Sequence, residues 1–201
     1  MITRIILMRH GRTEWNVGNR WQGQAPVPLD IMGRTQAHLA GQHLESAGLN
    51  RIFTSDLIRA AQTAQLVGDY VQVPIMPDPR LREIHVGIWQ GLTSEEVQLW
   101  DAERYAIVKA DPINTRRPQG ESWADVAERV RTALEEYVAR YTGQSLLVVT
   151  HGGVIRIILK TLGLAIDTNF TNENAALTEL HHEAEKWSLV TLGETAHLAD
   201  L

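Results

Sequence analysis

Three short apolar runs, at residues 3–8, 51–55 and 145–150, have the composition of buried strands. The first and last do not alternate polar with apolar residues, and strands covered on both faces of a parallel sheet have this pattern. We therefore predict strands at all three places, with 3–8 and 145–150 at the centre of a sheet.

Helical periodicity separates these strands along the chain. Small or apolar residues recur at helical spacing from Thr35 to Ala47, and Gly48 follows where a helix C-terminus favours glycine. The run from Asp56 to Val67 has the same spacing. Strands that alternate with helices of this length predict an α/β fold, in which helices sandwich a mostly parallel central sheet.

Two capping boxes mark further helices. Thr93 is followed three residues later by Glu96, and Ser122 by Asp125, so each pair can cap a helix N-terminus. Between these helices, residues 111–120 hold two prolines and a glycine and predict an irregular loop, either a lid or a connector. Near the end of the chain, residues 176–180 and 187–192 predict an antiparallel pair at the sheet edge.

Length and composition indicate one globular domain, residues 1–201, with a helical and loop insertion at about 92–120. The 201 residues are 44% hydrophobic and 21% charged, and the net charge of −5 argues against a nucleic-acid surface. The absence of cysteine excludes disulfides and thiolate metal sites. The N-terminal apolar run is too short for a signal peptide or a membrane span, so we expect a cytoplasmic protein with no membrane partner and no glycan on the Asn169 sequon.

Two histidines stand out among the residues able to carry chemistry. His10 and His151 each follow a predicted central strand, and each is followed at once by glycine. Ligands of open α/β sheets bind at the carboxyl ends of the strands. A glycine N–H and the start of the following helix suit an anion there, so the pattern predicts a phosphate site. The P-loop, dinucleotide, nucleophile-elbow and zincin motifs are all missing from the sequence.

The residues around His10 suggest roles in phosphoryl transfer. Arg9 precedes His10, and Arg59 falls on the first turn of the helix after the third strand. Two guanidiniums can hold a phosphoryl group bidentately without a metal ion, and a neutral imidazole can attack phosphorus. We therefore expect His10 as the nucleophile, Glu83 as the proton donor to the leaving group, and neither a metal nor another cofactor.

Six ordered blocks together resemble the histidine phosphatase (phosphoglycerate mutase-like) superfamily over residues 5 to about 155. Their sequences are Leu7-Met8-Arg9-His10-Gly11-Arg12-Thr13-Glu14-Trp15-Asn16, Gln22-Gly23 with Pro28-Leu29, residues 54–64, Leu81-Arg82-Glu83-Ile84 with Trp89-Gln90-Gly91, Gly120-Glu121-Ser122, and Val149-Thr150-His151-Gly152-Gly153.

The resemblance implies a three-layer α/β/α sandwich and a phosphohistidine on His10. It further implies that Arg9, Arg59 and His151 clamp the phosphoryl group, and that Glu83 acts first as general acid and then as base. Substrate contacts are expected from residues in or near the same blocks, namely Asn16, Gln22, Gly23, Gly152 and Arg116. The expected partner is a small phosphate monoester, and a homodimer is compatible with the sequence.

Several side chains keep two interpretations at this stage. Glu83 either reaches the pocket or pairs with Arg82. Arg12 occupies a position where many family members carry an acidic residue, and it either attracts anions or points to solvent. His85 either lines the pocket or lies half-exposed in a loop. Arg116 and Arg117 either recognise a second anion on the substrate or form a solvated pair.

Other residues keep further alternatives open. Glu14 and Glu121 are alternative acids near the blocks. His181 and His182 are interpreted as hairpin-turn polarity in preference to metal ligands.

Three functions remain compatible with the sequence: a metal-independent phosphomonoesterase, a cofactor-dependent phosphoglycerate mutase, and an inactive phospho-ligand-binding member. A residue is present for every catalytic role, which argues against the inactive form. Resembling mutases carry a longer insertion and a longer C-terminal tail over the site. Because water reaches a less enclosed phosphoenzyme, we expect hydrolysis.

Overall fold

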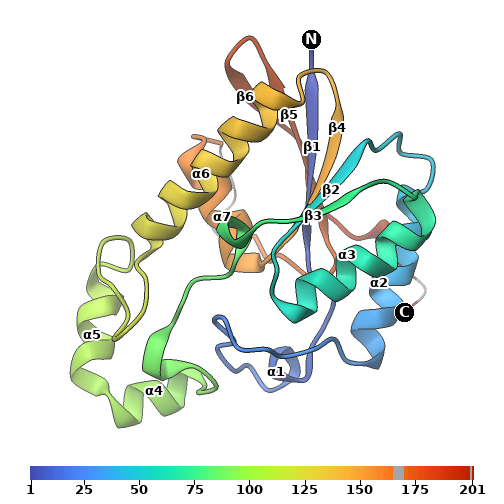
Figure 1. Ribbon diagram of the computed structural model, residues 1–201. Helices are drawn as coiled ribbons and strands as arrows, with labels where there is room; N and C mark the ends of the chain where they lie inside the picture. The colour runs from blue at the N-terminus through green and yellow to red at the C-terminus, as the bar shows by residue number, and fades with distance from the viewer. Residues whose placement is uncertain (165–169, 200) are drawn as a thin grey trace.

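A six-stranded mixed sheet runs through the centre of the computed structural model, which describes residues 1–164, 170–199 and 201 (Figure 1). Asn169 lies outside the described residues. The strands stand in the order β3-β2-β4-β1-β5-β6. Their bounds are β1 (Thr3–Arg9), β2 (Arg51–Thr54), β3 (Ile75–Pro77), β4 (Ser145–Thr150), β5 (Leu177–Glu183) and β6 (Lys186–Glu194). The pairs from β3 to β1 are parallel, and β5 is antiparallel to both β1 and β6.

Helices cover both faces of this sheet, as the sequence predicts. On one face lie α2 (Ile31–Leu44) and α3 (Ile58–Val71), and on the other α6 (Trp123–Arg140) and α7 (Gly152–Thr161) (Figure 1). Successive residues of β1 point to opposite faces, so Ile6 packs in the core beside α2 and α3 while Ile5 packs in the core beside α6 and α7. The three-layer α/β/α sandwich is confirmed.

The register of β1 and β4 sets up the site. Arg9 is opposite Thr150 in this parallel pair, and the N–H of His10 donates to the Thr150 carbonyl at 2.9 Å. Two parallel neighbours in this register end at the same level. His10 and His151 therefore leave the sheet side by side.

The helices keep their predicted places but not their predicted ends. The helix expected at 35–47 begins at Ile31, because Asp30 caps it by accepting the N–H of Gly33 at 2.7 Å. It also ends at Leu44, before Gly48. The helix expected at 56–67 runs from Ile58 to Val71.

Two differences concern the strands. Strand β3 was not predicted from the sequence, since its three residues are too few for a recognisable pattern. His181 and His182 lie within β5 and not in the hairpin turn, and His181 bonds Glu179 at 2.8 Å. Among the described residues, no group of three metal-ligating side chains forms around them or elsewhere.

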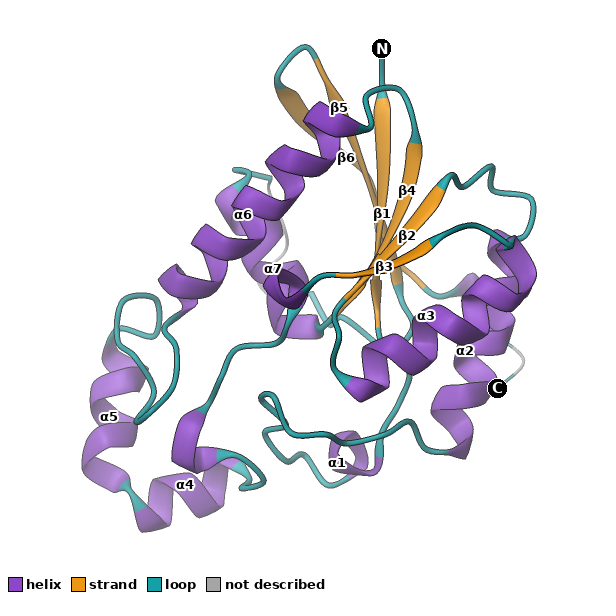
Figure 2. Ribbon diagram, viewed as in Figure 1, coloured by secondary structure: helices purple, strands orange, loops and turns teal. Residues whose placement is uncertain are grey.

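The insertion forms a small helical unit beside the sandwich (Figure 2). Both capping boxes are present, at α4 (Ser94–Trp100) and at α6, and α5 (Ala102–Ala110) follows α4. Trp89, Val97 and Val108 form its buried core. The segment 111–120 contains no helix or strand, as expected.

The remaining elements are short, and they comprise α1 (Glu14–Val17) and 3-10 turns at Pro79–Leu81, Gly87–Trp89 and Ala196–Leu198. No helix in the described part of the chain is long and apolar enough to cross a membrane.

Candidate active site

The ring of His10 is held in one neutral form. Its side chain is buried, and its Nδ1 lies 2.7 Å from the carbonyl oxygen of Gly11, so Nδ1 carries the proton and donates it. The Nε2 atom accepts a hydrogen bond from Nε of Arg59 at 3.3 Å. Burial, with the charges of Arg59 and Arg9, lowers the pKa of His10 well below its usual value. Nε2 is therefore unprotonated at neutral pH, and its lone pair is held by Arg59 until another acceptor replaces it.

Arg59 is fixed by a loop before any substrate arrives. It lies on the first turn of α3 and is fully buried. Its Nη1 and Nη2 donate to the carbonyls of Ala25 and Gly23 at 3.1 and 2.8 Å. Gly23 has φ +49°, a conformation that favours glycine. Burial lowers the pKa of Arg59 to about 10, so the guanidinium stays charged at neutral pH.

Arg9 approaches the site from the end of β1. Its guanidinium donates to the carbonyl of Asn172, and its side chain passes over Gly152, at the start of α7. Its Nε is buried and has no partner among the described residues. Burial lowers the pKa of Arg9, while the charge of Glu83 opposes the shift. A buried cation with an unused donor is suited to binding an anion.

His151 lies directly beside His10. Its ring centroid is 5.1 Å from that of His10, and its Nε2 is 2.8 Å from the hydroxyl of Ser55. Its Nδ1 is buried without a partner in the described part of the chain. Burial lowers the pKa of His151 well below the usual value, and the Arg59 charge adds to this. One ring nitrogen of His151 is therefore free to form a hydrogen bond, but the residue is fully buried and is not among those that line the cavity around His10.

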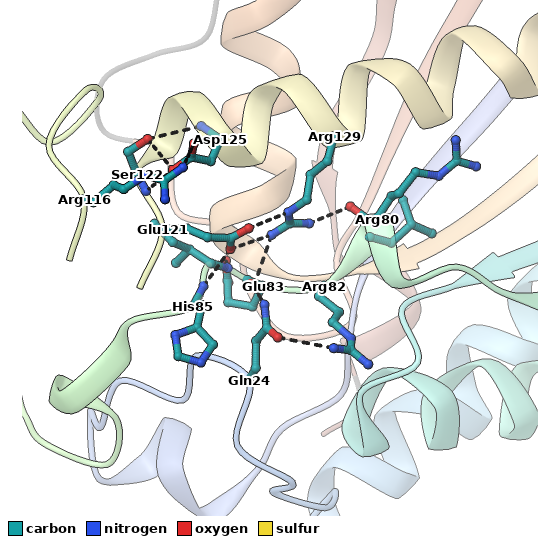
Figure 3. A network of polar contacts seen from close by, with 12 residues as sticks. Gln24, Arg80, Arg82, Glu83, His85, Arg116, Glu121, Ser122, Asp125 and Arg129 are labelled. Atoms are coloured by element: carbon teal, nitrogen blue, oxygen red, sulfur yellow. Dashed lines mark hydrogen bonds and ion pairs between the residues drawn. The ribbon is translucent and has the colours of Figure 1, made fainter. Parts of the chain in front are cut away.

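Glu83 lines the cavity, and its carboxylate lies at the start of α7. Its Oε1 accepts the N–H of Ile84 at 2.9 Å, and its Oε2 accepts that of Gly153 at 3.3 Å. Its own carbonyl is held by Nη2 of Arg129 at 3.2 Å and by Nε2 of Gln24 at 3.1 Å (Figure 3). These contacts fix both the backbone and the carboxylate of Glu83.

The alternatives weighed for Glu83 are not supported by the contacts. Arg82 pairs with Asp56, with its Nε 2.6 Å from Oδ1, and not with Glu83. Glu121 is paired with Nε of Arg129 at 3.0 Å. Glu14 is exposed at the start of α1.

One cavity of about 250 Å³ collects most of the expected residues. The side chains and glycines that line it are Arg9, His10, Asn16, Arg20, Gln22, Arg59, Glu83, Gly152, Gly153, Arg156 and Asn172. Four arginines and one glutamate line this cavity with His10, and this charge distribution suits a phosphate monoester.

The amide of Asn16 has a defined orientation. Its Oδ1 accepts hydrogen bonds from the N–H of Thr13 at 3.1 Å and from Nδ2 of Asn174 at 3.3 Å. With the oxygen occupied by these donors, the Nδ2 group is the part of the amide left to face an anion.

Some sequence expectations are not met in the structure. Arg116 does not reach the cavity: its exposed guanidinium pairs with Oδ1 of Asp125 at 2.6 Å (Figure 3). Gly23 lines a neighbouring cavity and not the one around His10. The N–H of Gly11 donates to the Thr63 hydroxyl at 3.0 Å, so it is not available to an anion.

Contacts also decide between the two interpretations of Arg12 and of His85. Arg12 bonds Asp30 through Nε at 2.8 Å, and does not line the cavity. His85 is half-buried in a loop, where its Nδ1 accepts the N–H of Gly87 at 3.1 Å.

Four residues that line the cavity were not expected there from the sequence: Arg20, Gly153, Arg156 and Asn172. Gly153 belongs to the last block of the resemblance but was given no role. Arg156 lies four residues after Gly152 in the same helix, so helical spacing from Gly152 is a signal that points to it. Arg20 and Asn172 come from irregular segments, and no spacing rule connects them with the histidines.

The comparison with known families agrees with this geometry. The family described as "Histidine phosphatase superfamily (branch 1)" matches residues 5–195. The chain belongs to this superfamily. As a histidine phosphatase, it is an enzyme of the class that hydrolyses phosphoric monoesters.

Curated relatives of this histidine phosphatase carry a mutase name. A "Probable phosphoglycerate mutase GpmB" from Yersinia enterocolitica is 35% identical over 207 residues, which cover 96% of this chain and 94% of that protein. The protein of the same name from Proteus mirabilis is 33% identical and covers 98% and 95%.

Several solved structures similar to this histidine phosphatase carry phosphatase names. Bacillus stearothermophilus YhfR superposes with a TM-score of 0.90 at 32% identity, over 98% of this chain and 99% of that one. A mycobacterial glucosyl-3-phosphoglycerate phosphatase, solved with VO3, gives 0.86 at 34% identity, over 96% and 99%. A putative alpha-ribazole-5'-P phosphatase from Escherichia coli gives 0.86 at 26% identity, over 96% of each chain.

Proposed function

We propose that this protein is a metal-independent phosphomonoesterase that hydrolyses small phosphorylated metabolites through a phosphohistidine on His10. The observation that carries the proposal is the state of the His10 ring. Nδ1 donates to Gly11, so the lone pair of Nε2 faces a cavity lined by arginines. A neutral imidazole in that position is a nucleophile for phosphorus.

In the first half of the reaction, Nε2 of His10 forms a bond to phosphorus while the bond from phosphorus to the ester oxygen breaks. Glu83 gives its proton to that oxygen, so the product leaves as a neutral alcohol. Arg9 and Arg59 balance the charge on the non-bridging oxygens throughout. This role for fixed guanidiniums supports catalysis without a metal ion.

In the second half, water attacks the phosphorus of phosphohistidine, and the bond from phosphorus to Nε2 breaks. Glu83, now a carboxylate, takes a proton from the attacking water. Inorganic phosphate leaves, and both His10 and Glu83 return to their starting forms. The same carboxylate therefore serves as acid in one half and as base in the other.

Hydrolysis is proposed over mutase activity for two reasons. The insertion before Gly120 is short, and the cavity around His10 is not enclosed, so water can reach a phosphohistidine there. Similar solved structures with sequence identities of 26–34% carry phosphatase names. The mutase name of the curated relatives makes mutase activity the alternative to test directly.

The test is acid quench during turnover with a phosphorus-labelled ester. We expect an acid-labile, base-stable label on the native enzyme and none on His10→Ala, with turnover lost in parallel. His38→Ala is the matched control, since His38 is exposed on α2. Label that persists in His10→Ala contradicts the proposal.

A second assay separates the two activities. Supplied with 3-phosphoglycerate and 2,3-bisphosphoglycerate, the enzyme is expected to release inorganic phosphate. Formation of 2-phosphoglycerate at a higher rate than phosphate contradicts hydrolysis as the main activity.

A further inference from the structure

A second cavity, of about 310 Å³, opens beside the one around His10. Both cavities are lined by Gln22, Glu83 and Gly153, so they meet at the carboxylate proposed as the proton donor. A phosphate ester bound with its phosphoryl group at His10 places its ester oxygen near Glu83. The second cavity is then where the rest of the alcohol lies.

Gly153 brings the two cavities into contact. A Cβ at this position would stand 2.3 Å from Cη2 of Trp123 and 2.8 Å from Oε1 of Glu83. Only glycine leaves room for the indole edge and the carboxylate to approach the start of α7 together. The indole of Trp123 is therefore an immediate neighbour of the proton donor.

The walls of the second cavity are mainly apolar. Trp21, Ile84, Val86 and Trp123 provide most of the side chains that line it. An alcohol rich in hydroxyl groups would lose hydrogen bonds to water there, while a flat apolar body would bury its surface against the indoles. The volume is at the small end of the range for small-molecule sites, roughly 300–1,000 Å³, and fits a compact body.

Arg117 adds one positive charge to this apolar space. Its guanidinium lies 5.3 Å from the ring centroid of Trp123, and the residue is only 8% exposed. Its described hydrogen bonds go to two carbonyls, at 2.9 Å to Pro112 and at 3.5 Å to Thr115, and it has no ion pair within the described part of the chain. The charge of Glu83 acts on Arg117 without forming an ion pair, and a bound carboxylate would give this buried cation a direct anionic partner.

We infer that this second cavity is a leaving-group site for an alcohol with a flat apolar body and a carboxylate at its far end, where Arg117 binds the carboxylate. The inference rests on the proposed phosphatase function, because it takes Glu83 as the proton donor. The neighbouring Arg116 does not take part, since its guanidinium is exposed and paired with Asp125 (Figure 3).

Matched esters of primary alcohols test the apolar part, because they all need a proton on the leaving oxygen. We expect kcat/KM for benzyl phosphate to exceed that for ethyl phosphate and glycerol 3-phosphate by about tenfold or more. Trp123→Ala should reduce the ratio of benzyl to ethyl phosphate toward one, and Trp123→Phe should retain most of it. Equal kcat/KM for the three esters in the unmodified enzyme overturns the inference, whether or not Trp123→Ala folds.

The carboxylate is tested with 4-carboxybenzyl phosphate against its neutral analogue, 4-carbamoylbenzyl phosphate. The native enzyme should favour the carboxylate, and Arg117→Gln should lower this ratio about tenfold or more. Arg116→Gln is the control and should leave the ratio unchanged. The same change in both variants, or in neither, overturns the role of Arg117.

Failure of the proposed function is distinguished by the label on His10. Label from any of these esters together with release of inorganic phosphate, but without the expected ratios, supports the phosphatase and contradicts only the leaving-group site. No label from any ester contradicts the proposed function and this inference together.

Discussion

The Nε of Arg59 lies 3.3 Å from Nε2 of His10 and donates a hydrogen bond to the atom expected to attack phosphorus. The other two nitrogens of the guanidinium hold the carbonyls of Gly23 and Ala25. One side chain therefore positions the nucleophile and the 23–25 loop at once. An incoming phosphoryl group replaces the ring nitrogen as the acceptor for Nε.

Arg59→Lys is expected to slow phosphorylation of His10 severely. Lysine keeps the charge, but its single nitrogen cannot contact both loop carbonyls and the reacting group. Loss of one donor to the developing charge typically reduces rates by about 10² to 10³. Rapid-quench single-turnover rates measure this, and Arg34→Lys on the exposed side of α2 is the control. A rate within threefold of the native one contradicts the clamp.

Ser55→Ala is expected to change the protonation of His151. The hydroxyl of Ser55 accepts the N–H of Leu57 at 3.3 Å, so its own hydrogen is free for Nε2 of His151 at 2.8 Å. We expect the hydroxyl to donate to Nε2, which places the ring proton on Nδ1 and lets Nδ1 donate to a phosphoryl oxygen. We expect Ser55→Ala to slow phosphorylation about tenfold or more, and Ser55→Thr to slow it less.

Nitrogen-15 NMR of the His151 ring separates this effect from a general loss of structure. The native ring and that of Ser55→Thr should carry the proton on Nδ1, and Ser55→Ala should show a mixture. A native ring protonated on Nε2 shows the assignment to be wrong.

The arrangement of the sandwich was predictable because it depends on a repeated physical pattern. Strands buried on both faces need continuous apolar runs, and β1 and β4 have them. Parallel strands end at the same edge, so His10 and His151 could be placed together from the sequence. Helix ends were less predictable, because a single side chain such as Asp30 sets the start of α2.

Residues on irregular segments were not predictable in the same way. Arg116 and Arg117 are adjacent residues of the same type, but they lie in different environments. Arg116 is exposed and pairs with Asp125, whereas Arg117 is buried beside Trp123. The difference comes from the path of the 111–120 loop, which no periodic pattern records. Arg20 and Asn172 reach the cavity for the same kind of reason.

A chelator should leave the rate unchanged. The charge on the phosphoryl oxygens is expected to be balanced by Arg9 and Arg59, which cannot be removed by chelation. The measurement is release of inorganic phosphate with and without EDTA. A loss of activity that magnesium restores contradicts the proposed mechanism.

The two buried histidines should make folding sensitive to mild acid. Burial lowers the pKa values of both His10 and His151 well below those of the unfolded chain. Below about pH 6.5 the unfolded chain binds protons that the folded protein does not. The free energy of unfolding therefore falls as the pH falls, by about 1.4 kcal/mol per pH unit for each histidine.

Urea unfolding between pH 7 and pH 5, in buffers without phosphate, measures this slope. At the lower end of this range, the slope of the unfolding free energy against pH should be about 2.7 kcal/mol per pH unit smaller in the double variant His10→Asn, His151→Asn. His38→Asn, at an exposed position, should keep the native slope. Identical slopes in the native protein and the double variant contradict the burial argument.

Glu83→Gln isolates the proton transfer to the leaving group. General acid catalysis contributes roughly 10² to 10⁴ in rate, and its value depends on how basic the departing oxygen is. An alkoxide needs the proton, whereas nitrophenolate departs well without it. Phosphorylation by ethyl phosphate should therefore slow severely in Glu83→Gln, and phosphorylation by p-nitrophenyl phosphate much less.

Single-turnover rates are needed for this comparison, because Glu83 is also expected to activate water in the second half of the reaction. Each rate is divided by that of the native enzyme for the same ester, so that binding in the leaving-group site cancels to a first approximation. Glu95→Gln, exposed on α4, is the control. If both esters lose the same factor, the proton comes from another group, and Glu83 serves only to orient Gly153 and the start of α7 through its 3.3 Å contact.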